Sequence, residues 1–123
     1  MTPFGAKLRQ LRRERGITLK QMAAALAVSP AYLSALEHGK RGVPTWYMVH
    51  RIIGYFNVIW DEAEELQRLA EMSDPRVVVD TAGLEPEATE LANLLAQRIR
   101  GLSRTSLADL TLRLRAAAAK DGA

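Results

Sequence analysis

Residues 18–39, TLKQMAAALAVSPAYLSALEHG, decide the fold of this chain, because they contain the start and stop signals of two short helices joined by a tight turn. Thr18 can cap a first helix over residues 19–27, since its hydroxyl can accept a hydrogen bond from a free backbone N–H of the first turn. The apolar residues of this helix repeat at the three- and four-residue spacing of one buried face: Met22, Ala23 and Leu26. The small side chain of Ala23 also permits a crossing helix to approach closely.

The second helix follows a short connection, residues 27–29. Ser29 can cap it, and Pro30 suits its first position, where the missing N–H has no intrahelical partner to lose. Gly39 is expected to end it, because glycine readily takes the left-handed conformation found after helices. Two leucines would face the core, Leu33 and Leu36, and four residues would form an exposed side, Ala31, Tyr32, Ser34 and Ala35.

Helical signals also flank this stretch on both sides. A helix is predicted over residues 4–15, with Phe4, Leu8 and Leu11 on one face and Gly16 at its end. Thr45 can cap a further helix ending near Asn57. We expect its apolar side to contain Trp46, Val49, Ile52, Ile53 and Phe56.

A fifth helix is predicted from Asp61, read as its cap, through Met72. Three acidic residues in its first turn complement the helix dipole: Glu62, Glu64 and Glu65. Its inward side is expected to contain Ala63, Leu66, Leu69 and Ala70. Residues 1–72 would thus form one domain of five helices.

Together these residues resemble the lambda-repressor-like, Xre-type helix-turn-helix family over roughly residues 4–72. The matching parts are LRQLRRERGIT at 8–18, residues 23–28, Leu33-Ser34, Leu36-Glu37, Gly39-Lys40 and Pro44. The resemblance implies that the helix from Ser29 to His38 enters the major groove of DNA while the preceding helix crosses the phosphate backbone. It also implies an internal ion pair between Arg12 and Glu37.

Base-reading positions follow from the same resemblance: Ser29, Pro30, Ala31, Tyr32 and Ala35. Alanine and proline cannot make the paired hydrogen bonds to guanine or adenine that longer polar side chains make. Thymine methyl groups, the hydroxyls of Ser29, Ser34 and Tyr32, and DNA shape would then supply the readout. Tyr32 can alternatively pack against the helix that carries Lys20.

Phosphate contacts are expected on both sides of the second helix. The family usually has a glutamine at the position of Leu19. Because leucine cannot bind a phosphate, we expect Lys20, Gln21 and Thr18 to bind the DNA backbone instead. The loop after the second helix would add Lys40, Arg41 and Thr45.

Other prominent residues have structural interpretations: Arg9, Arg13 and Arg15 as solvated charges, His38 as a helix-end residue, and Trp46 and Trp60 as core or domain-seam residues.

The remaining chain divides into a linker and a helical hairpin. Residues 73–84 contain Pro75 and the β-branched run Val77–Val79, which predicts an extended connector or a short strand that pairs with its copy in a second subunit. Residues 85–123 contain two amphipathic helices, starting near Pro86 and Ser103, and a tail from Ala116 whose last residues fray. Their apolar residues would bury against the first domain, each other or, by preference, a second subunit: Leu91, Leu94, Leu95, Ile99, Leu102, Leu107, Leu110 and Leu114. The predicted fold class is therefore all-α.

Charge and composition limit the function. Residues 1–41 contain eight basic and two acidic residues, which suits one face turned toward phosphates, whereas the net charge of the whole chain is +3. With no cysteine and two separated histidines, no metal site or cofactor is expected. No apolar run reaches the roughly 20 residues of a membrane span and no signal-peptide core precedes the first charges, so cytoplasmic residence is expected.

The expected function is a homodimeric, sequence-specific transcriptional regulator on double-stranded DNA, more often a repressor in this family. Activation through contact with RNA polymerase is an alternative, for which the acidic helix from Asp61 offers a surface. A second alternative is an antitoxin or other interaction module whose C-terminal helices bind a toxin-like partner. An enzyme is not expected, because the chain has no recognisable nucleophile, metal cluster or glycine-rich phosphate loop.

Overall fold

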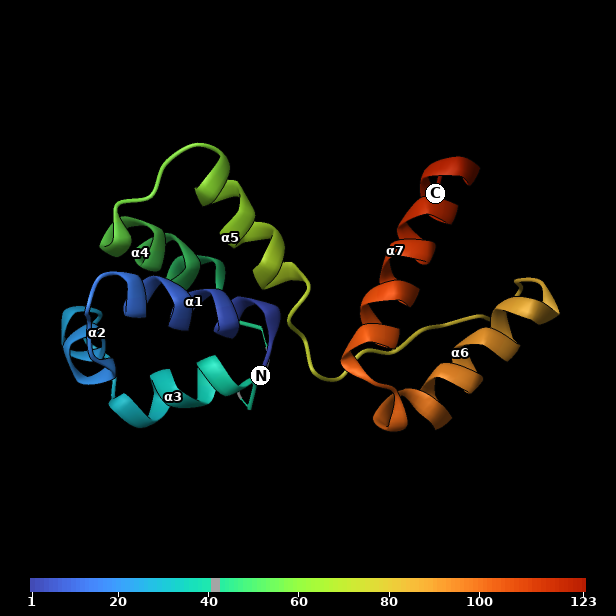
Figure 1. Ribbon diagram of the computed structural model, residues 1–123, viewed down its shortest axis with the longest axis horizontal. Helices are drawn as coiled ribbons and strands as arrows, with labels where there is room; N and C mark the ends of the chain where they lie inside the picture. The colour runs from blue at the N-terminus through green and yellow to red at the C-terminus, as the bar shows by residue number, and fades with distance from the viewer. Residues whose placement is uncertain (41–42) are drawn as a thin grey trace. The chain divides into compact units, whose positions relative to one another are not determined.

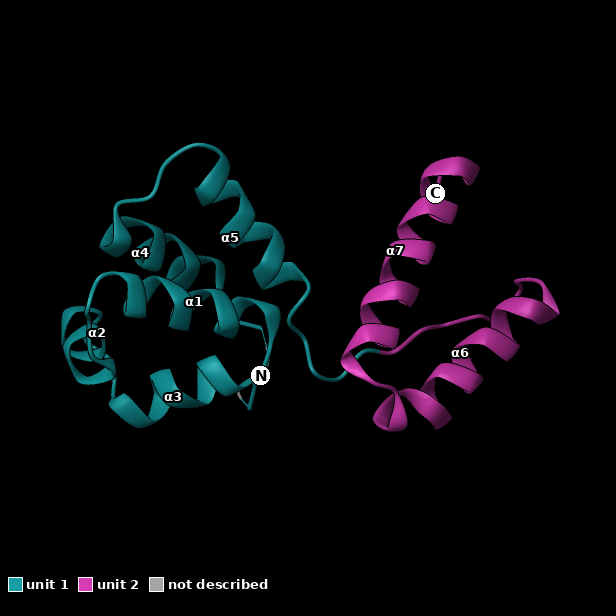
Figure 2. Cartoon of the chain, viewed as in Figure 1, with its two compact units in different colours: residues 1–77 teal, residues 78–123 magenta. Residues whose placement is uncertain are grey.

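The computed structural model describes residues 1–40 and 43–123, which contain seven α-helices, one 3-10 turn and no strand. The chain divides into two compact units, Met1–Val77 and Val78–Ala123 (Figure 2). Unit 1 contains the helices α1 to α5, and unit 2 contains α6, the 3-10 turn η1 and α7 (Figure 1). The fold is therefore all-helical, as the sequence predicts.

Unit 1 places its helices close to the predicted positions. They are α1 Pro3–Glu14, α2 Leu19–Ala25, α3 Pro30–His38, α4 Trp46–Phe56 and α5 Asp61–Glu71. The second helix ends two residues earlier than expected, because Ala27 takes a left-handed φ of 57°. Buried apolar side chains from all five helices form one core: Phe4, Leu8, Leu11, Met22, Ala23, Leu26, Leu33, Leu36, Met48, Val49, Ile52, Phe56, Val58, Leu66 and Ala70.

Two tryptophans and one cap differ from the sequence prediction. Trp46 is 59% exposed, with its ring edge-on to His50 at a centroid distance of 4.5 Å, and Trp60 is 80% exposed, so neither is a core residue. Met48 takes the expected inward place of Trp46 on α4. Asp61 is the first helical residue of α5 and not its cap; the cap position belongs to Trp60, which makes no side-chain capping bond.

Several polar contacts hold α1 against the end of the unit. Ser73 lies just beyond α5, accepts a hydrogen bond from the Phe4 N–H at 3.1 Å and donates one to the Leu69 carbonyl. Lys7 lies 3.9 Å from both Glu62 and Glu65 of α5. These contacts join the first helix of unit 1, α1, to its last helix, α5, and to the residue just beyond it.

Unit 2 contains α6 Pro86–Arg98, η1 Ile99–Gly101 and α7 Arg104–Asp121. The helices α6 and α7 run apart from η1 (Figure 1), and none of the residues in these three elements is buried. The tail is helical through Asp121, with Gly122 left-handed at its end. Residues 73–84, all described, form no strand in the chain by itself.

Among the described residues, no helix is both long and apolar enough to cross a membrane.

Candidate DNA-binding interface

A capping box starts α2. The Thr18 hydroxyl accepts a hydrogen bond from the Gln21 N–H at 3.1 Å, and the Gln21 side-chain carbonyl accepts one from the Thr18 N–H at 2.9 Å. These reciprocal bonds satisfy two backbone donors that a helix start otherwise leaves free. Gln21 thus has a structural role that the sequence interpretation missed, and its amide nitrogen remains available to a phosphate.

The turn between α2 and α3 is short because its backbone bonds back to α2. Val28 donates to the Ala23 carbonyl at 3.0 Å while Ala27 reverses the chain with its positive φ. Ser29 then caps α3 by accepting a hydrogen bond from the Tyr32 N–H at 3.0 Å. Gly39 ends α3 with a φ of 76°, in agreement with the predicted stop signal. The turn therefore sets the direction of α3 from local residues alone.

An ion pair fastens α3 to α1. Arg12 donates from Nε to Glu37 at 2.8 Å, from a terminal nitrogen to the second Glu37 oxygen at 3.0 Å, and to the Ile17 carbonyl at 3.3 Å. Glu37 is 2% exposed, so its charge depends on this partner. The hydrogen bond to Glu37 raises the pKa of Arg12 against the opposing effect of burial, which keeps the guanidinium charged.

The backbones of α1 and α3 also meet closely at Gly5. A Cβ atom at Gly5 would lie 1.9 Å from the Glu37 carbonyl oxygen, far inside van der Waals contact. Glycine is therefore required for the two helices to cross at this point. The crossing and the ion pair share Glu37, so together they fix both the distance and the rotation of α3.

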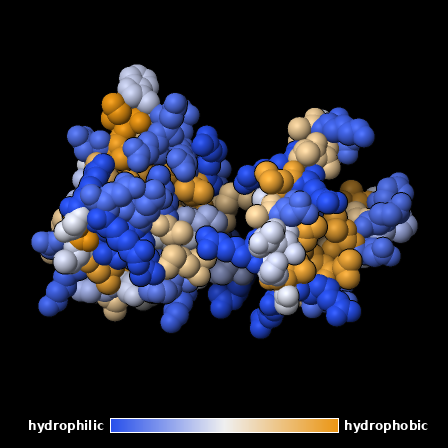
Figure 3. Space-filling view, viewed as in Figure 1, coloured by the Kyte–Doolittle hydropathy of each residue, from blue (hydrophilic) through white to orange (hydrophobic). Residues whose placement is uncertain are grey.

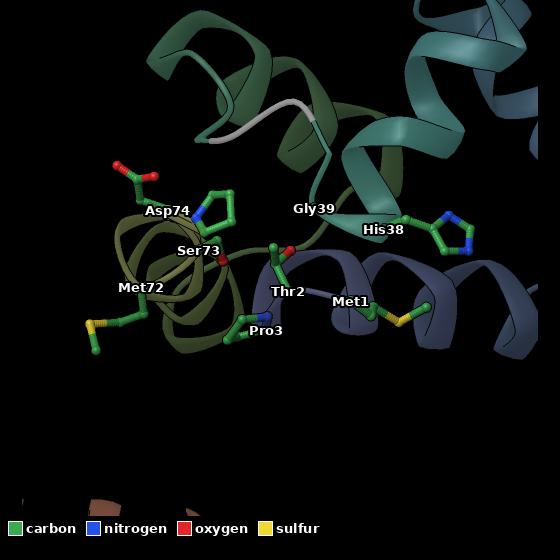
Figure 4. Close-up of a pocket in the computed structure, with 9 residues that line it drawn as sticks. Met1, Thr2, Pro3, His38, Gly39, Met72, Ser73 and Asp74 are labelled. Carbon is green, nitrogen blue, oxygen red and sulfur yellow. The ribbon is translucent and has the colours of Figure 1, made fainter. Parts of the chain in front are cut away.

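The C-terminal end of α3 rests beside the start of the chain. A pocket of about 240 Å³ lies here. Figure 4 shows its lining residues, which come from the N-terminus of α1, the end of α3 and the residues after α5. Its lining residues are Met1, Thr2, Pro3, His38, Gly39, Met72, Ser73, Asp74 and Pro75. None of the residues predicted to contact DNA lines it, and it lies at the opposite end of α3 from Ser29.

The opposite, N-terminal end of α3 is open. Most of the residues predicted to contact DNA are exposed: Thr18, Lys20, Gln21, Ser29, Pro30, Ala31, Lys40 and Thr45. Three are half-buried, Tyr32, Ser34 and Ala35, and the Tyr32 side chain packs against the core. Arg41 lies outside the described residues. The starts of α2 and α3 are thus exposed, and Lys40 is exposed just beyond the other end of α3.

Part of the basic excess of residues 1–41 has a structural role. Lys7 faces the acidic residues of α5 and Arg12 binds Glu37. Arg15 is exposed, as the sequence predicts, and it also donates to the Phe56 carbonyl at the end of α4, with its guanidinium 5.3 Å from the centroid of the Phe56 ring. The lysines that remain beside α2 and α3 are Lys20 and Lys40, both exposed.

Sequence reasoning missed Gly5, Ser73 and Arg15. A glycine inside an otherwise helical pattern was a usable signal for Gly5, since such a glycine often marks close packing. Ser73 and Arg15 gave no local signal, because their partners are 69 and 41 residues away along the chain. The described residues contain no group of three or more potential metal ligands.

An exposed helix presented by a tight two-helix turn within a compact helical unit is the arrangement of a helix-turn-helix domain. Residues 3–69, more than half of the chain, match the helix-turn-helix domain family. The chain belongs to this family, and the match extends over α1 to α4 and most of α5.

Two curated relatives from Bacillus subtilis (strain 168) are regulators by name. The chain is 38% identical over 61 residues to the uncharacterized HTH-type transcriptional regulator RghRB, which is 50% of this chain and 44% of that protein. It is 52% identical over 44 residues to the HTH-type transcriptional repressor RghR, which is 36% of this chain and 33% of that protein. The chain thus spans less than half the length of these relatives. No solved structure matches it.

Proposed function

We propose that the protein is a sequence-specific DNA-binding transcriptional regulator of the lambda-repressor-like, Xre type, and that it is a repressor. The observation that carries this proposal is the geometry of α3. The close approach at Gly5 fixes its distance from α1, and the Ser29 cap fixes its first residue. Pro30 and Ala31, at this end of the helix, are exposed. Major-groove readout uses the N-terminal residues of such a helix. The family match and the two relatives support the same function.

The exposed start of α3 favours apolar readout. Ala31 and Ala35 can contact thymine methyl groups but offer no hydrogen bond to a base edge. Ser29 already accepts the capping bond from Tyr32, which leaves its hydroxyl hydrogen for a base or a phosphate. Sequence preference would then depend on few direct hydrogen bonds and on the deformability of the site.

Phosphate binding would flank this readout. Lys20 near the start of α2 and Lys40 after α3 are exposed cations, and Thr18 and Thr45 add hydroxyls at the starts of α2 and α4. We include Arg41 in this set by its place in the sequence. Contacts of this kind set register on the duplex and give most of the salt dependence of binding.

The working form would be a homodimer on a pseudo-palindromic operator, with two α3 helices roughly 34 Å apart. Support comes from unit 2, whose helices leave their apolar residues half-buried or exposed. Figure 3 shows apolar side chains gathered over the α6 and α7 region. The proposed dimer residues are Leu91, Leu94, Leu95, Ile99, Leu102, Leu107, Leu110 and Leu114. Residues 1–72 would bind DNA and residues 85–123 would dimerise, joined by 73–84.

A genome-fragment selection tests this function. The purified full chain is incubated with fragments of its source genome near physiological salt, and the retained DNA is sequenced. We expect one enriched inverted repeat close to promoters. A matched selection with Lys40→Ala should retain less of every fragment, whereas Lys120→Ala, an exposed lysine at the end of α7, should behave like the unaltered chain. Binding without any enriched motif would exclude a sequence-specific regulator.

The second candidate is an antitoxin or another protein-interaction module. It is favoured by the same exposed leucines, which a partner protein could cover as well as a second copy. Sedimentation equilibrium of the full chain discriminates the two candidates. A stable dimer with helical unit 2 supports the regulator, and a monomer whose unit 2 loses helicity in solution supports the interaction module.

A further inference from the structure

The loop between α4 and α5 carries an exposed apolar pair. Ile59 is 65% exposed and Trp60 80% exposed, while the neighbouring Val58 is buried and its N–H donates to the Ile53 carbonyl at 3.3 Å. Figure 3 shows apolar side chains gathered over this loop, which arches away from the other helices of unit 1 in Figure 1. Ile59 and Trp60, called the loop knob below, therefore project from an anchored loop.

The backbone of the loop knob is unusual. Trp60 has a φ of 54° and a ψ of −124°, and Asn57 three residues earlier is also left-handed. A bulky side chain rarely occupies positive φ, and such strain is most common where a residue binds something. Tryptophan is also the residue most enriched at the centres of protein interfaces. The conformation thus holds a large apolar side chain in solvent.

The border of the loop knob is acidic. Asp61 and Glu64 in the first turn of α5 are exposed, and they form no ion pair among the described residues. Glu62 and Glu65 differ from them because they face Lys7 at 3.9 Å. An occupant of this surface should therefore combine an apolar centre with positive charge.

A surface of that composition lies on α7 of the same sequence. A shallow, open surface on one side of α7, called the α7 groove below, is formed by Arg104, Leu107, Ala108, Thr111, Leu112 and Arg115. Leu112 is 64% exposed, and the two arginines are three helical turns apart along the groove. Of the two acidic residues in α7, Asp109 pairs with Arg113 at 3.1 Å and Asp121 lies at the far end. The groove is thus apolar with basic ends.

The α7 groove shares Leu107 with the proposed dimer, but its Leu112 side faces away from the other dimer leucines of α7. Successive residues of an α-helix are rotated by about 100°, so Leu112 points to the side opposite Leu110 and Leu114, each two residues away. Pairing of α7 through Leu110 and Leu114 therefore leaves Leu112 uncovered. The helix α7 therefore has apolar side chains on two sides, and a different protein surface can cover each side.

We propose that the loop knob of one copy docks into the α7 groove of another copy, with Asp61 and Glu64 facing Arg104 and Arg115. The proposal rests on two properties that match between these exposed surfaces of one sequence: both have apolar side chains at the centre, and their flanking charges are of opposite sign. Two different patches meet, so the contact is heterologous and links dimers instead of closing one. On DNA it would couple dimers at neighbouring sites. The contact itself does not require DNA binding.

Cysteine cross-linking tests the contact directly, because the natural chain has no cysteine. Proteins carrying Ile59→Cys and Leu112→Cys are prepared separately, mixed and oxidised gently. We expect a disulfide-linked pair in the mixture and little in either protein alone, since a disulfide forms only when the two Cα atoms come within about 7 Å. A mixture of Met72→Cys and Leu112→Cys is the matched control, because Met72 is as exposed as Ile59 but outside the loop knob.

Other outcomes overturn the proposal. Linkage no greater than in the Met72→Cys control excludes the contact. Self-linkage of Ile59→Cys alone shows a symmetric contact between two knobs. A chain carrying both cysteines that closes an internal disulfide at high dilution shows a contact within one copy.

Charge reversal supplies the second measurement. Association beyond the dimer is measured by sedimentation velocity over a concentration series. Trp60→Ala should weaken it roughly 30-fold, as expected for an interface hot spot. Arg104→Glu with Arg115→Glu should weaken it as well, and adding Asp61→Lys with Glu64→Lys should restore it, whereas Arg113→Glu outside the groove should change little. Failure of the restoring pair would exclude the charge contact.

Discussion

Glu37 does two things at once: its side chain receives Arg12, and its backbone carbonyl lies against Gly5. Glu37 therefore takes part in both contacts that hold α3 against α1. Arg12 is exposed on 14% of its side chain and Glu37 on 2%, so the pair is largely removed from water. At the residue scale, the proposed DNA binding would depend on residues that only hold α3 in place.

Arg12→Met should lower the free energy of unfolding by roughly 3–5 kcal/mol, because it leaves Glu37 charged and buried without a partner. Urea unfolding followed by circular dichroism measures this change. Asp109→Asn is the matched control, since it breaks the exposed Asp109–Arg113 pair, whose worth is about 0.3–0.5 kcal/mol. Equal effects of the two substitutions would contradict the structural role of the Arg12–Glu37 pair.

Gly5→Ala should also destabilise unit 1, because its Cβ would collide with backbone, which cannot rotate away as a side chain can. Overpacking costs roughly 1–3 kcal/mol, and we expect the upper part of that range. Gly54→Ala in α4 is the matched control: nothing lies within 4 Å of its Cβ position, so alanine should stabilise that helix by up to about 1 kcal/mol. Thermal unfolding of both variants decides the point, and two changes of the same sign would argue against the close crossing of α1 and α3.

Hydrogen bonds between residues that are close along the chain were predictable from the sequence. The caps at Thr18, Ser29 and Thr45 each bond three residues ahead, and the structure contains all three. The contact of Arg15 with Phe56 was not predicted, because the two residues are 41 positions apart along the chain. Partners within one helical turn can be predicted from the local sequence, whereas the Arg12–Glu37 pair, 25 residues apart, was predicted only through the family resemblance.

Among the elements, α3 carries the proposed readout and the loops around it carry the proposed phosphate contacts. Its exposed residues are small, so a change of side chain there alters chemistry without removing a core contact. The predictions at this scale therefore separate affinity for any DNA from preference for one sequence.

Lys40→Ala should weaken binding to all DNA sequences and reduce the slope of log affinity against log salt by about 0.9, the loss of one phosphate contact. Fluorescence anisotropy with one fragment at several salt concentrations measures both quantities. Lys120→Ala on α7 should leave them unchanged. A Lys40→Ala effect confined to one sequence would contradict a phosphate contact.

Ala35→Gln should change which sequences are enriched, because glutamine can form paired hydrogen bonds with adenine, worth about 1–3 kcal/mol of discrimination. Selection from random DNA followed by sequencing compares the enriched motifs. Ala24→Gln, at an exposed position of α2, is the control and should leave the motif as it is. An unchanged motif in Ala35→Gln would place this position away from the bases.

In the molecule as a whole, the two units differ in how much of their apolar surface they bury. Unit 1 has a closed core and carries the helix-turn-helix, whereas the helices of unit 2 bury no residue. Helices without a core of their own need a partner surface for stability. The proposed dimer and the proposed contact between dimers both use that property of unit 2.

Truncation after Leu84 should leave a folded, monomeric domain that binds its operator much more weakly, because the two half-sites are no longer engaged together. Circular dichroism reports folding, sedimentation equilibrium reports mass, and anisotropy reports affinity. A truncated protein that still dimerises would move the dimer interface to unit 1.

The sequence by itself determined that the chain is all-helical, where α1 to α5 begin and end to within about two residues, and which family it resembles. These properties depend on caps, left-handed glycine and apolar spacing, which act within one or two helical turns. Only the tertiary structure decided that Trp46 and Trp60 face solvent, that Gly5 admits the backbone of α3, and that Arg15 binds the end of α4. Those properties depend on residues brought together from distant parts of the chain, and a single linear pattern does not contain their distances.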